Sequence, residues 1–239
     1  DASRMIYVAS KSDHGHLYLI NPFCDASMSP NVCSHPSQID KSVSVAFGTP
    51  PLLAYGSVYI GDVAGTLYKF NKDTLTIEKT FTLPPGRSIQ MGPIASPNGD
   101  IVFVSGGGMM YSITKDLNTV RWQKDLGYTP LFGIPAASSN AIYMAFDGHL
   151  HAYNPSSGAL LWKRSLGGEI SYASVSVGYG REVYVQGVTG KVLAFNEGWG
   201  FSPAHITAAV MANGPRQVME ISILQSLTPI SSTLSLTPA

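Results

Sequence analysis

The fold is decided by the stretch Ala141-Ile-Tyr-Met-Ala-Phe-Asp-Gly-His-Leu-His-Ala-Tyr-Asn-Pro-Ser-Ser-Gly-Ala-Leu-Leu-Trp-Lys-Arg-Ser-Leu166. It predicts two short strands joined by a turn at Asp147-Gly148, a second turn from Asn154 to Gly158, and a third strand carrying Trp162. Asp-Gly between two alternating apolar runs is the strongest short-range signal of a β-hairpin. Each run is too short for a helix, and a period of two sends successive side chains to opposite faces.

The same unit recurs along the chain, and each copy is marked by a glycine at the hairpin turn. These glycines are Gly15, Gly65, Gly108, Gly148 and Gly190, and they are separated by 50, 43, 40 and 42 residues. Each glycine stands three residues before a predicted core position: Tyr18, Tyr68, Tyr111, His151 and Leu193. Glycine supplies the positive φ that a tight hairpin turn needs.

A fourth strand is expected before each hairpin, opened by glycine and proline. The segments are Gly48-Thr-Pro-Pro-Leu-Leu-Ala54, Gly92-Pro-Ile-Ala-Ser96 and Gly133-Ile-Pro-Ala-Ala137. Proline suits the start of a strand or an innermost strand, where a ladder donor is not needed. Four strands in roughly 40 to 45 residues predict an all-β fold, a β-propeller whose blades bury their faces against one another.

The unit resembles the PQQ-like repeat of the quinoprotein (pyrroloquinoline-quinone) propeller family. The residues that carry the resemblance are Tyr143, Gly148, Ala152-Tyr153-Asn154, Ser157-Gly158, Leu161-Trp162 and Leu166, and one repeat earlier Val120-Arg-Trp122 and Leu126. The resemblance implies about five PQQ-like repeats of four-stranded blades, whereas the family usually has more blades. We expect either a five-repeat ring closed by its termini or, as we favour, an incomplete propeller.

The repeats are expected to occupy residues 1–196, and residues 197–239 form an atypical C-terminal segment. Residues 1–21 predict a first hairpin, followed by a long loop over residues 22–42. Within the C-terminal segment, residues 205–211 and 218–224 are expected to pair as closing strands around Asn213-Gly-Pro215. The Ser/Thr/Leu/Pro-rich end from Ser226 is expected to be mobile or to lie on a partner.

The composition excludes several kinds of partner. The chain has 239 residues, 15 basic and 15 acidic side chains and a formal net charge of +0. Without a basic cluster, nucleic acid and anionic membrane are poor partners. No apolar run approaches the roughly 20 residues of a membrane span, so none is expected.

Cys24 and Cys33 are the only cysteines of the chain, and they bracket a Ser/Pro/Asn-rich loop. A disulfide between them would remove loop entropy worth roughly 2 to 3 kcal/mol. It would also imply an oxidising, extracytoplasmic compartment, either secreted, periplasmic or lumenal. Two free thiols in a cytosolic chain are the alternative. A zinc site is disfavoured, because only His35 could add a ligand nearby.

Other candidate sites have a structural and a functional interpretation. His14 and His16, and His149 and His151, could each grip a metal from one strand face, but a structural role is favoured. Gly106-Gly-Gly108 is favoured as a hairpin turn over a phosphate loop, and Ser171 to Ser176 as a strand over an esterase nucleophile. Trp122 and Trp162 are expected to pack between blades instead of stacking on a quinone.

Two classes of function follow from the resemblance. The favoured one is a non-catalytic extracytoplasmic propeller without cofactor, which scaffolds a larger assembly or binds a protein partner. The alternative is part of a PQQ-dependent dehydrogenase that oxidises alcohols or sugars with PQQ and calcium. The family's enzymes often carry adjacent cysteines, which this chain lacks. Its acids, such as Asp62, Asp100, Asp147 and Glu169, are expected at turns and form no recognisable cradle.

Overall fold

A computed structural model describes residues 5–11, 14–20, 38–127, 134–168, 174–178, 182–189, 191–196 and 206–209, the last range by its backbone alone. The chain divides into two compact units, residues 1–131 and 132–239. The regular elements assigned in the described ranges are all β-strands. None of the described segments is a helix of the length and apolarity that crossing a membrane requires.

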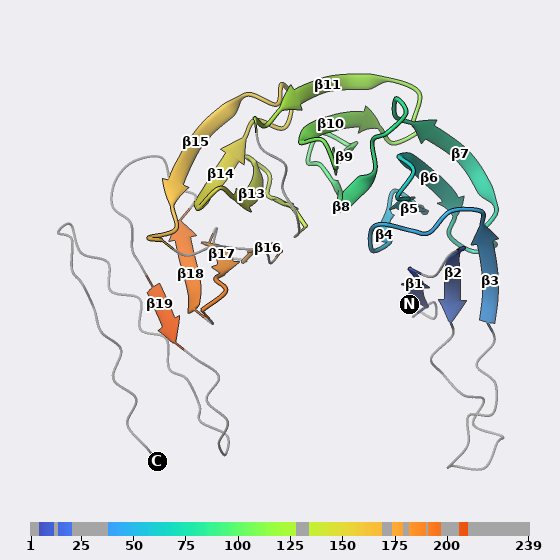
Figure 1. Ribbon diagram of the computed structural model, residues 1–239, viewed down its shortest axis with the longest axis horizontal. Coiled ribbons are helices and arrows are strands. Elements are labelled where there is room, and N and C mark those ends of the chain that lie inside the picture. The colour runs from blue at the N-terminus through green and yellow to red at the C-terminus, as the bar shows by residue number, and fades with distance from the viewer. Residues whose placement is uncertain are drawn as a thin grey trace, which may run out of the picture. The chain divides into compact units, whose positions relative to one another are not determined.

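The first unit contains three antiparallel sheets, counted over its described residues. The first has the order β1-β2-β3, with β1 (Ile6–Ala9), β2 (Gly15–Ile20) and β3 (Gln38–Val43). The second runs β4 (Leu52–Ala54), β5 (Ser57–Gly61), β6 (Thr66–Asn71) and β7 (Ile77–Thr82). The third runs β8 (Ile89–Ala95), β9 (Asp100–Ser105), β10 (Met109–Thr114) and β11 (Val120–Asp125). Figure 1 shows that the strands of each sheet lie side by side in chain order.

The second unit contains two four-stranded antiparallel sheets, again within the described residues. One runs β12 (Ala136–Ala137), β13 (Ile142–Phe146), β14 (His149–Tyr153) and β15 (Leu160–Ser165). The other runs β16 (Val175–Val177), β17 (Glu182–Gln186), β18 (Lys191–Asn196) and β19 (Ile206–Ala209). The short strands expected before the hairpins are therefore present in four of the sheets, as β4, β8, β12 and β16.

Two strands differ from the sequence-based expectation. The loop expected over residues 22–42 ends earlier, because β3 begins at Gln38 and pairs with β2. Residues 206–209 pair with β18, with Leu193 opposite Thr207, and so complete the last sheet as its fourth strand. Residues 218–224 lie outside the described residues, so the expected pairing of residues 205–211 with residues 218–224 stays a prediction.

Alternation along β5 distributes its side chains between two cores. Val58 and Ile60 point to one face and join a cluster with Leu17 and Leu19 of β2. Tyr59, between them, points to the other face and joins a cluster with β9 and β10. All three β5 side chains are fully buried. Each fully buried side chain of this size contributes about 1.5 to 3 kcal/mol, so the sheet β4–β7 stabilises both of its neighbours.

The pairing of the third strand with the outermost strand has the same irregularity in three sheets. The pairing register shifts between Lys69 and Phe70, between Ser112 and Ile113, and between Ala152 and Tyr153. A bulge of this kind bends a strand and increases its twist. Because it recurs at one position of the repeat, it belongs to the architecture of the unit and not to one sheet.

Candidate interaction surface

The turn glycines take two different roles. Gly65, Gly108 and Gly148 have φ values of +95°, +77° and +64°, the left-handed region that an L side chain disfavours. Asp147 precedes Gly148 with φ +49°, so this two-residue loop has the two positive φ angles of a type I′ hairpin turn. Gly15 has no positive φ; a Cβ there would lie 2.6 Å from the Val45 carbonyl oxygen, so close approach of the backbone requires the glycine. Gly190 lies outside the described residues.

Side-chain oxygens that could bind a ligand or act in catalysis instead accept hydrogen bonds within the hairpin turns. Asp62 is buried, and its carboxylate accepts hydrogen bonds from the amides of Ala64 (3.0 Å) and Thr66 (2.7 Å) and from the Tyr68 hydroxyl (3.0 Å). Burial, and next the charge of Asp62, raise the pKa of Tyr68 to about 12. The carboxylate therefore organises its own hairpin and is not available to a ligand.

Serine replaces this aspartate at the equivalent turn positions. The hydroxyl oxygen of Ser105 accepts from the amide of Met109 at 3.3 Å, and that of Ser10 from the amide of His16 at 3.3 Å. Two amides of the Gly106-Gly-Gly108 turn are also used, because Gly106 donates to the Ser88 carbonyl oxygen and Gly108 to that of Ser105. The turn thus follows the hairpin interpretation of the triglycine.

In the sheet β12–β15, the repeat position of Tyr68 is occupied by a histidine that stacks on a phenylalanine. His151 occupies the place of Tyr68, and its ring lies 4.0 Å from that of Phe146 with an interplanar angle of 8°. Burial, and then the nearby charges of His149 and Lys163, lower the pKa of His151 to about 4. Its Nδ1 atom is buried and has no hydrogen-bond partner among the described residues. A neutral ring in an aromatic stack is a core histidine.

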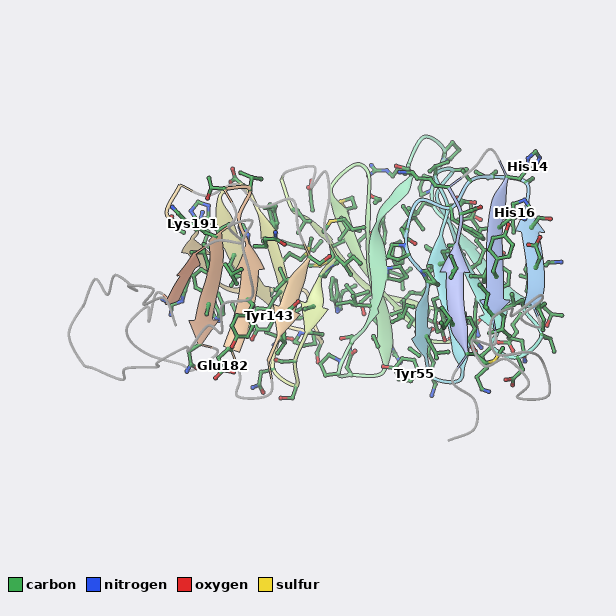
Figure 2. All side chains as sticks on the ribbon, turned by 90° about the horizontal axis from the view of Figure 1, so that it is seen from below. His14, His16, Tyr55, Tyr143, Glu182 and Lys191 are labelled. Atoms are coloured by element: carbon green, nitrogen blue, oxygen red, sulfur yellow. The ribbon has the colours of Figure 1, made fainter. Side chains whose placement is uncertain are left out.

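The remaining histidines do not build a metal centre in the part of the chain that the structure describes. His16 lies 3.0 Å from the Asp40 carboxylate and stacks on Tyr18. Figure 2 shows His14 and His16 at the same end of the first unit, opposite the end where Tyr55 lies. No group of three or more metal-ligating side chains converges among these described residues.

Trp122 and Trp162 lie on outermost strands at equivalent places, opposite Ser112 and Ala152, respectively. Trp162 packs against the core between the two sheets of its unit, with its ring 5.8 Å from that of Tyr143. The Arg164 guanidinium covers the indole at 5.5 Å. Such cation–π contacts add to packing, and this position is that of a structural residue.

Several predicted features fall outside the described residues. These are the proposed Cys24–Cys33 disulfide, the acidic Glu169, and the first residues of the segment from Ser171 to Ser176. Asp100 is described: its carboxylate accepts from Asn98 and from the Ser112 hydroxyl, again within one sheet.

Tyrosines that link neighbouring sheets were missed by the sequence-based reasoning. The Tyr7 hydroxyl donates to the Lys72 carbonyl oxygen at 2.9 Å, and the Tyr59 hydroxyl donates to that of Lys115 at 2.6 Å. Tyr7 is the second residue of β1 and Tyr59 the third residue of β5, and each lysine directly follows the third strand of the next sheet, β6 or β10. The signal was a tyrosine at a fixed place in the repeat, but no sequence pattern shows which carbonyl it reaches.

Open apolar surface gathers at the first strand. Ile6 and Val8 of β1 are 47% and 42% exposed, whereas the equivalent Val58 and Ile60 of β5 are fully buried. Within the described residues, β1 pairs with β2 alone, so its sheet has three strands where the others have four. Among the described residues, β1 thus exposes apolar side chains at positions that are buried in the next sheet.

The comparisons with known proteins agree with the repeat. A family model described as outer membrane protein assembly factor BamB matches residues 79–225. Among solved structures, the chain is similar to BamB from Moraxella catarrhalis, with a TM-score of 0.60 and 15% identity over 80% of this chain and 54% of that chain. The chain therefore spans about half the length of that protein. Comparison with proteins of curated function gives no match. The predicted fold class, an all-β PQQ-like β-propeller, is confirmed.

Proposed function

The chain belongs to the family described as outer membrane protein assembly factor BamB, and on this premise we propose that it is a non-catalytic, protein-binding subunit of a larger assembly outside the cytoplasm. The family description names a process, the assembly of outer membrane proteins. We propose that this chain serves the same process as a scaffold and needs no cofactor for it.

One observation carries the proposal: polar side chains at the hairpin turns, where loops could have built a catalytic centre, are bonded within their own sheets. Asp62 accepts three hydrogen bonds, and Ser105 substitutes for it one repeat later. Buried polar groups satisfied in this way stabilise a fold. In contrast, β1 exposes uncharged apolar side chains, which suit contact with a protein.

The compartment is part of the proposal. A bridge between Cys24 and Cys33 requires an oxidising environment, and assembly at an outer membrane takes place in one. The partner is then expected to be a component of the assembly or one of its clients, held at a fixed ratio to this chain.

Affinity capture after brief chemical cross-linking tests the proposal in cells that export the tagged chain. We expect one partner at a constant ratio to the chain across three expression levels, identified by mass spectrometry. An exported unrelated β-propeller of equal size provides the control. Capture that does not exceed this control would contradict the scaffold role.

A second measurement tests the non-catalytic part. The purified chain is titrated with PQQ and calcium, and quinone absorbance and dye reduction with simple alcohols or sugars are followed. We expect neither a stoichiometric absorbance change nor turnover. Saturable binding with dye reduction would replace the scaffold by a quinoprotein dehydrogenase.

A further inference from the structure

We propose that the turn between β9 and β10 binds a carboxylate of a partner polypeptide, which the Arg87 guanidinium and the Gly107 amide hold together. The carboxylate belongs either to an acidic side chain or to the C terminus of that polypeptide. The inference rests on the proposed function, because it names a site through which the scaffold recognises its partner. Arginine side chains and backbone amides are the groups with which proteins generally bind carboxylates of other chains.

The preceding repeat contains the carboxylate that this turn lacks. The turn after β5 and the turn after β9 are equivalent, because their glycines, Gly65 and Gly108, are 43 residues apart. In the first of these turns, the Asp62 carboxylate accepts hydrogen bonds from the amides of Ala64 (3.0 Å) and Thr66 (2.7 Å). One carboxylate therefore satisfies two amide donors of that turn.

Serine, with its shorter side chain, satisfies less of the turn after β9. The positions of Asp62, Ala64 and Thr66 are taken there by Ser105, Gly107 and Met109. The Ser105 hydroxyl oxygen accepts from the Met109 amide at 3.3 Å. The Gly107 amide makes no hydrogen bond to any residue that the structure describes. The exchange of aspartate for serine thus leaves an amide donor without its carboxylate.

The Arg87 guanidinium lies on this same glycine. A Cβ built on Gly107 would be 2.8 Å from Nη1 and 3.6 Å from Cζ of Arg87. The guanidinium is a permanent cation, and no ion pair within the described part of the chain includes Arg87. A positive charge and an unused amide donor therefore meet at one residue, and a carboxylate can accept hydrogen bonds from both.

The backbone of Arg87 is held from two sides. Its carbonyl oxygen packs so closely against Gly65 that a Cβ there would lie 1.9 Å away. The carbonyl oxygen of the next residue, Ser88, accepts from the Gly106 amide at 2.7 Å, which joins this segment to the turn after β9. Because the base of the side chain is fixed in advance, binding costs less conformational entropy.

The turn also leaves room for a ligand. Of its three glycines only Gly108 has a positive φ, so the backbone conformation does not require glycine at positions 106 and 107. The equivalent residues of the preceding repeat, Val63 and Ala64, carry side chains. Glycine permits close approach of a ligand to the backbone, and Gly107 is exposed. A carboxylate from outside can therefore reach the amide.

Two-dimensional NMR of the full chain tests the inference with three pentapeptides. Acetyl-Ala-Ala-Glu-Ala-Ala-amide carries a side-chain carboxylate, acetyl-Ala-Ala-Gln-Ala-Ala with a free C terminus carries a terminal one, and acetyl-Ala-Ala-Gln-Ala-Ala-amide carries neither. We expect saturable shifts of the Gly107 amide and of the Arg87 Nε–H signal with at least one of the first two peptides and none with the third. The peptide that binds more tightly identifies the source of the carboxylate.

Matched variants locate the binding. Ser105→Asp gives this turn the carboxylate that Asp62 supplies in the preceding repeat, so it should occupy the Gly107 amide and abolish peptide binding. Arg87→Gln should weaken binding roughly tenfold, as expected for the loss of one charge-assisted hydrogen bond. Arg121→Gln makes the same change of charge beside Asp100, and it should bind like the original chain.

Four results would overturn the inference. The first is an Arg87 Nε–H signal that shifts on acidification of the free chain as a carboxylate protonates, which means that the chain itself supplies the anion. The second is no saturable shift with either carboxylate peptide. The third is an equal loss in Arg87→Gln and Arg121→Gln, which means general attraction by charge. The fourth is unchanged binding in Ser105→Asp.

Partner capture separates this inference from the proposed function. If capture persists unchanged in Arg87→Gln and Ser105→Asp, the carboxylate site fails as a partner site while the scaffold role stands. If the peptides bind at Gly107 but no partner is captured by the original chain, the site stands and the scaffold role fails.

Discussion

Replacing Gly65 by alanine should destabilise the first unit far more than the same change at Gly148 destabilises the second. Both glycines have positive φ, at +95° and +64°, so alanine costs at least about 1 to 2 kcal/mol at either position. The difference lies in the surroundings. A Cβ on Gly148 has no atom within 4 Å, whereas one on Gly65 falls 1.9 Å from the Arg87 carbonyl oxygen.

The size of this destabilisation depends on the hydrogen bonds that hold the Arg87 carbonyl in place. Arg87 lies between Leu83, whose amide donates to Gly65, and Ile89, whose amide donates to Asp62. The backbone must move by about 1 Å to reach even a tight 3.0 Å contact, and this movement breaks one or both hydrogen bonds. At about 1 kcal/mol for each bond, the cost of Gly65→Ala rises to about 2 to 4 kcal/mol, against about 1 to 2 kcal/mol for Gly148→Ala.

Native-state amide exchange measures the two effects separately. The slowest amides of β6 report the opening free energy of the first unit, and those of β14 that of the second. Each variant should lower the free energy of its own unit and leave the other unchanged. Equal losses for the two variants would refute the reasoning, because strain in φ alone would then explain both.

Three more predictions concern the contacts between sheets, a core histidine and the cysteines. Tyr59→Phe removes the bond to the Lys115 carbonyl and should cost about 1 to 2 kcal/mol in urea unfolding, whereas an unchanged midpoint would show that this bond adds nothing. The pKa of His151 is lowered to about 4 by burial, so the unfolded chain takes up a proton first as the pH falls. Stability should be complete above pH 6.5 and decline towards pH 4, and His151→Phe should lessen this decline; identical pH profiles would contradict the assignment. Finally, alkylation without reductant should leave Cys24 and Cys33 unmodified in exported chain, and modification of either in the intact mass would exclude the bridge.

The repeat could be predicted because its determinants are local. The Asp147-Gly148 dipeptide favours the two positive φ angles of a hairpin turn, and the alternating apolar residues around it predict which side chains are buried. The strand β3 was missed since Gln38–Val43 lies at the outside of its sheet, where Ile39 is 40% exposed and the pattern of burial is weak. Residues 206–209 were expected to form a strand, but their pairing with β18 was not foreseen, because the pattern of a single strand does not show its partner.

The contacts of the candidate surface were harder to predict from the sequence. A tyrosine at position 59 predicts a buried ring, but its hydrogen bond to Lys115 depends on how two sheets face each other. Gly15 illustrates the same limit: its place in the repeat predicted a turn conformation, and the structure shows a close approach to Val45 instead. The exposure of Ile6 and Val8 became visible only once β1 had been compared with β5.

The division of β5 between two cores constrains how the chain can change in length. Val58 and Ile60 belong to one hydrophobic core and Tyr59 to the other. An excised sheet β4–β7 would therefore carry part of both cores and would complete neither. Removing one full period, for example by joining the chain at Thr66 to the equivalent Met109, brings together faces that already have the same phase. A cut by an odd number of residues within a strand would place a solvent-facing side chain where an interior one belongs, so duplication and loss should proceed most easily in steps of a whole module.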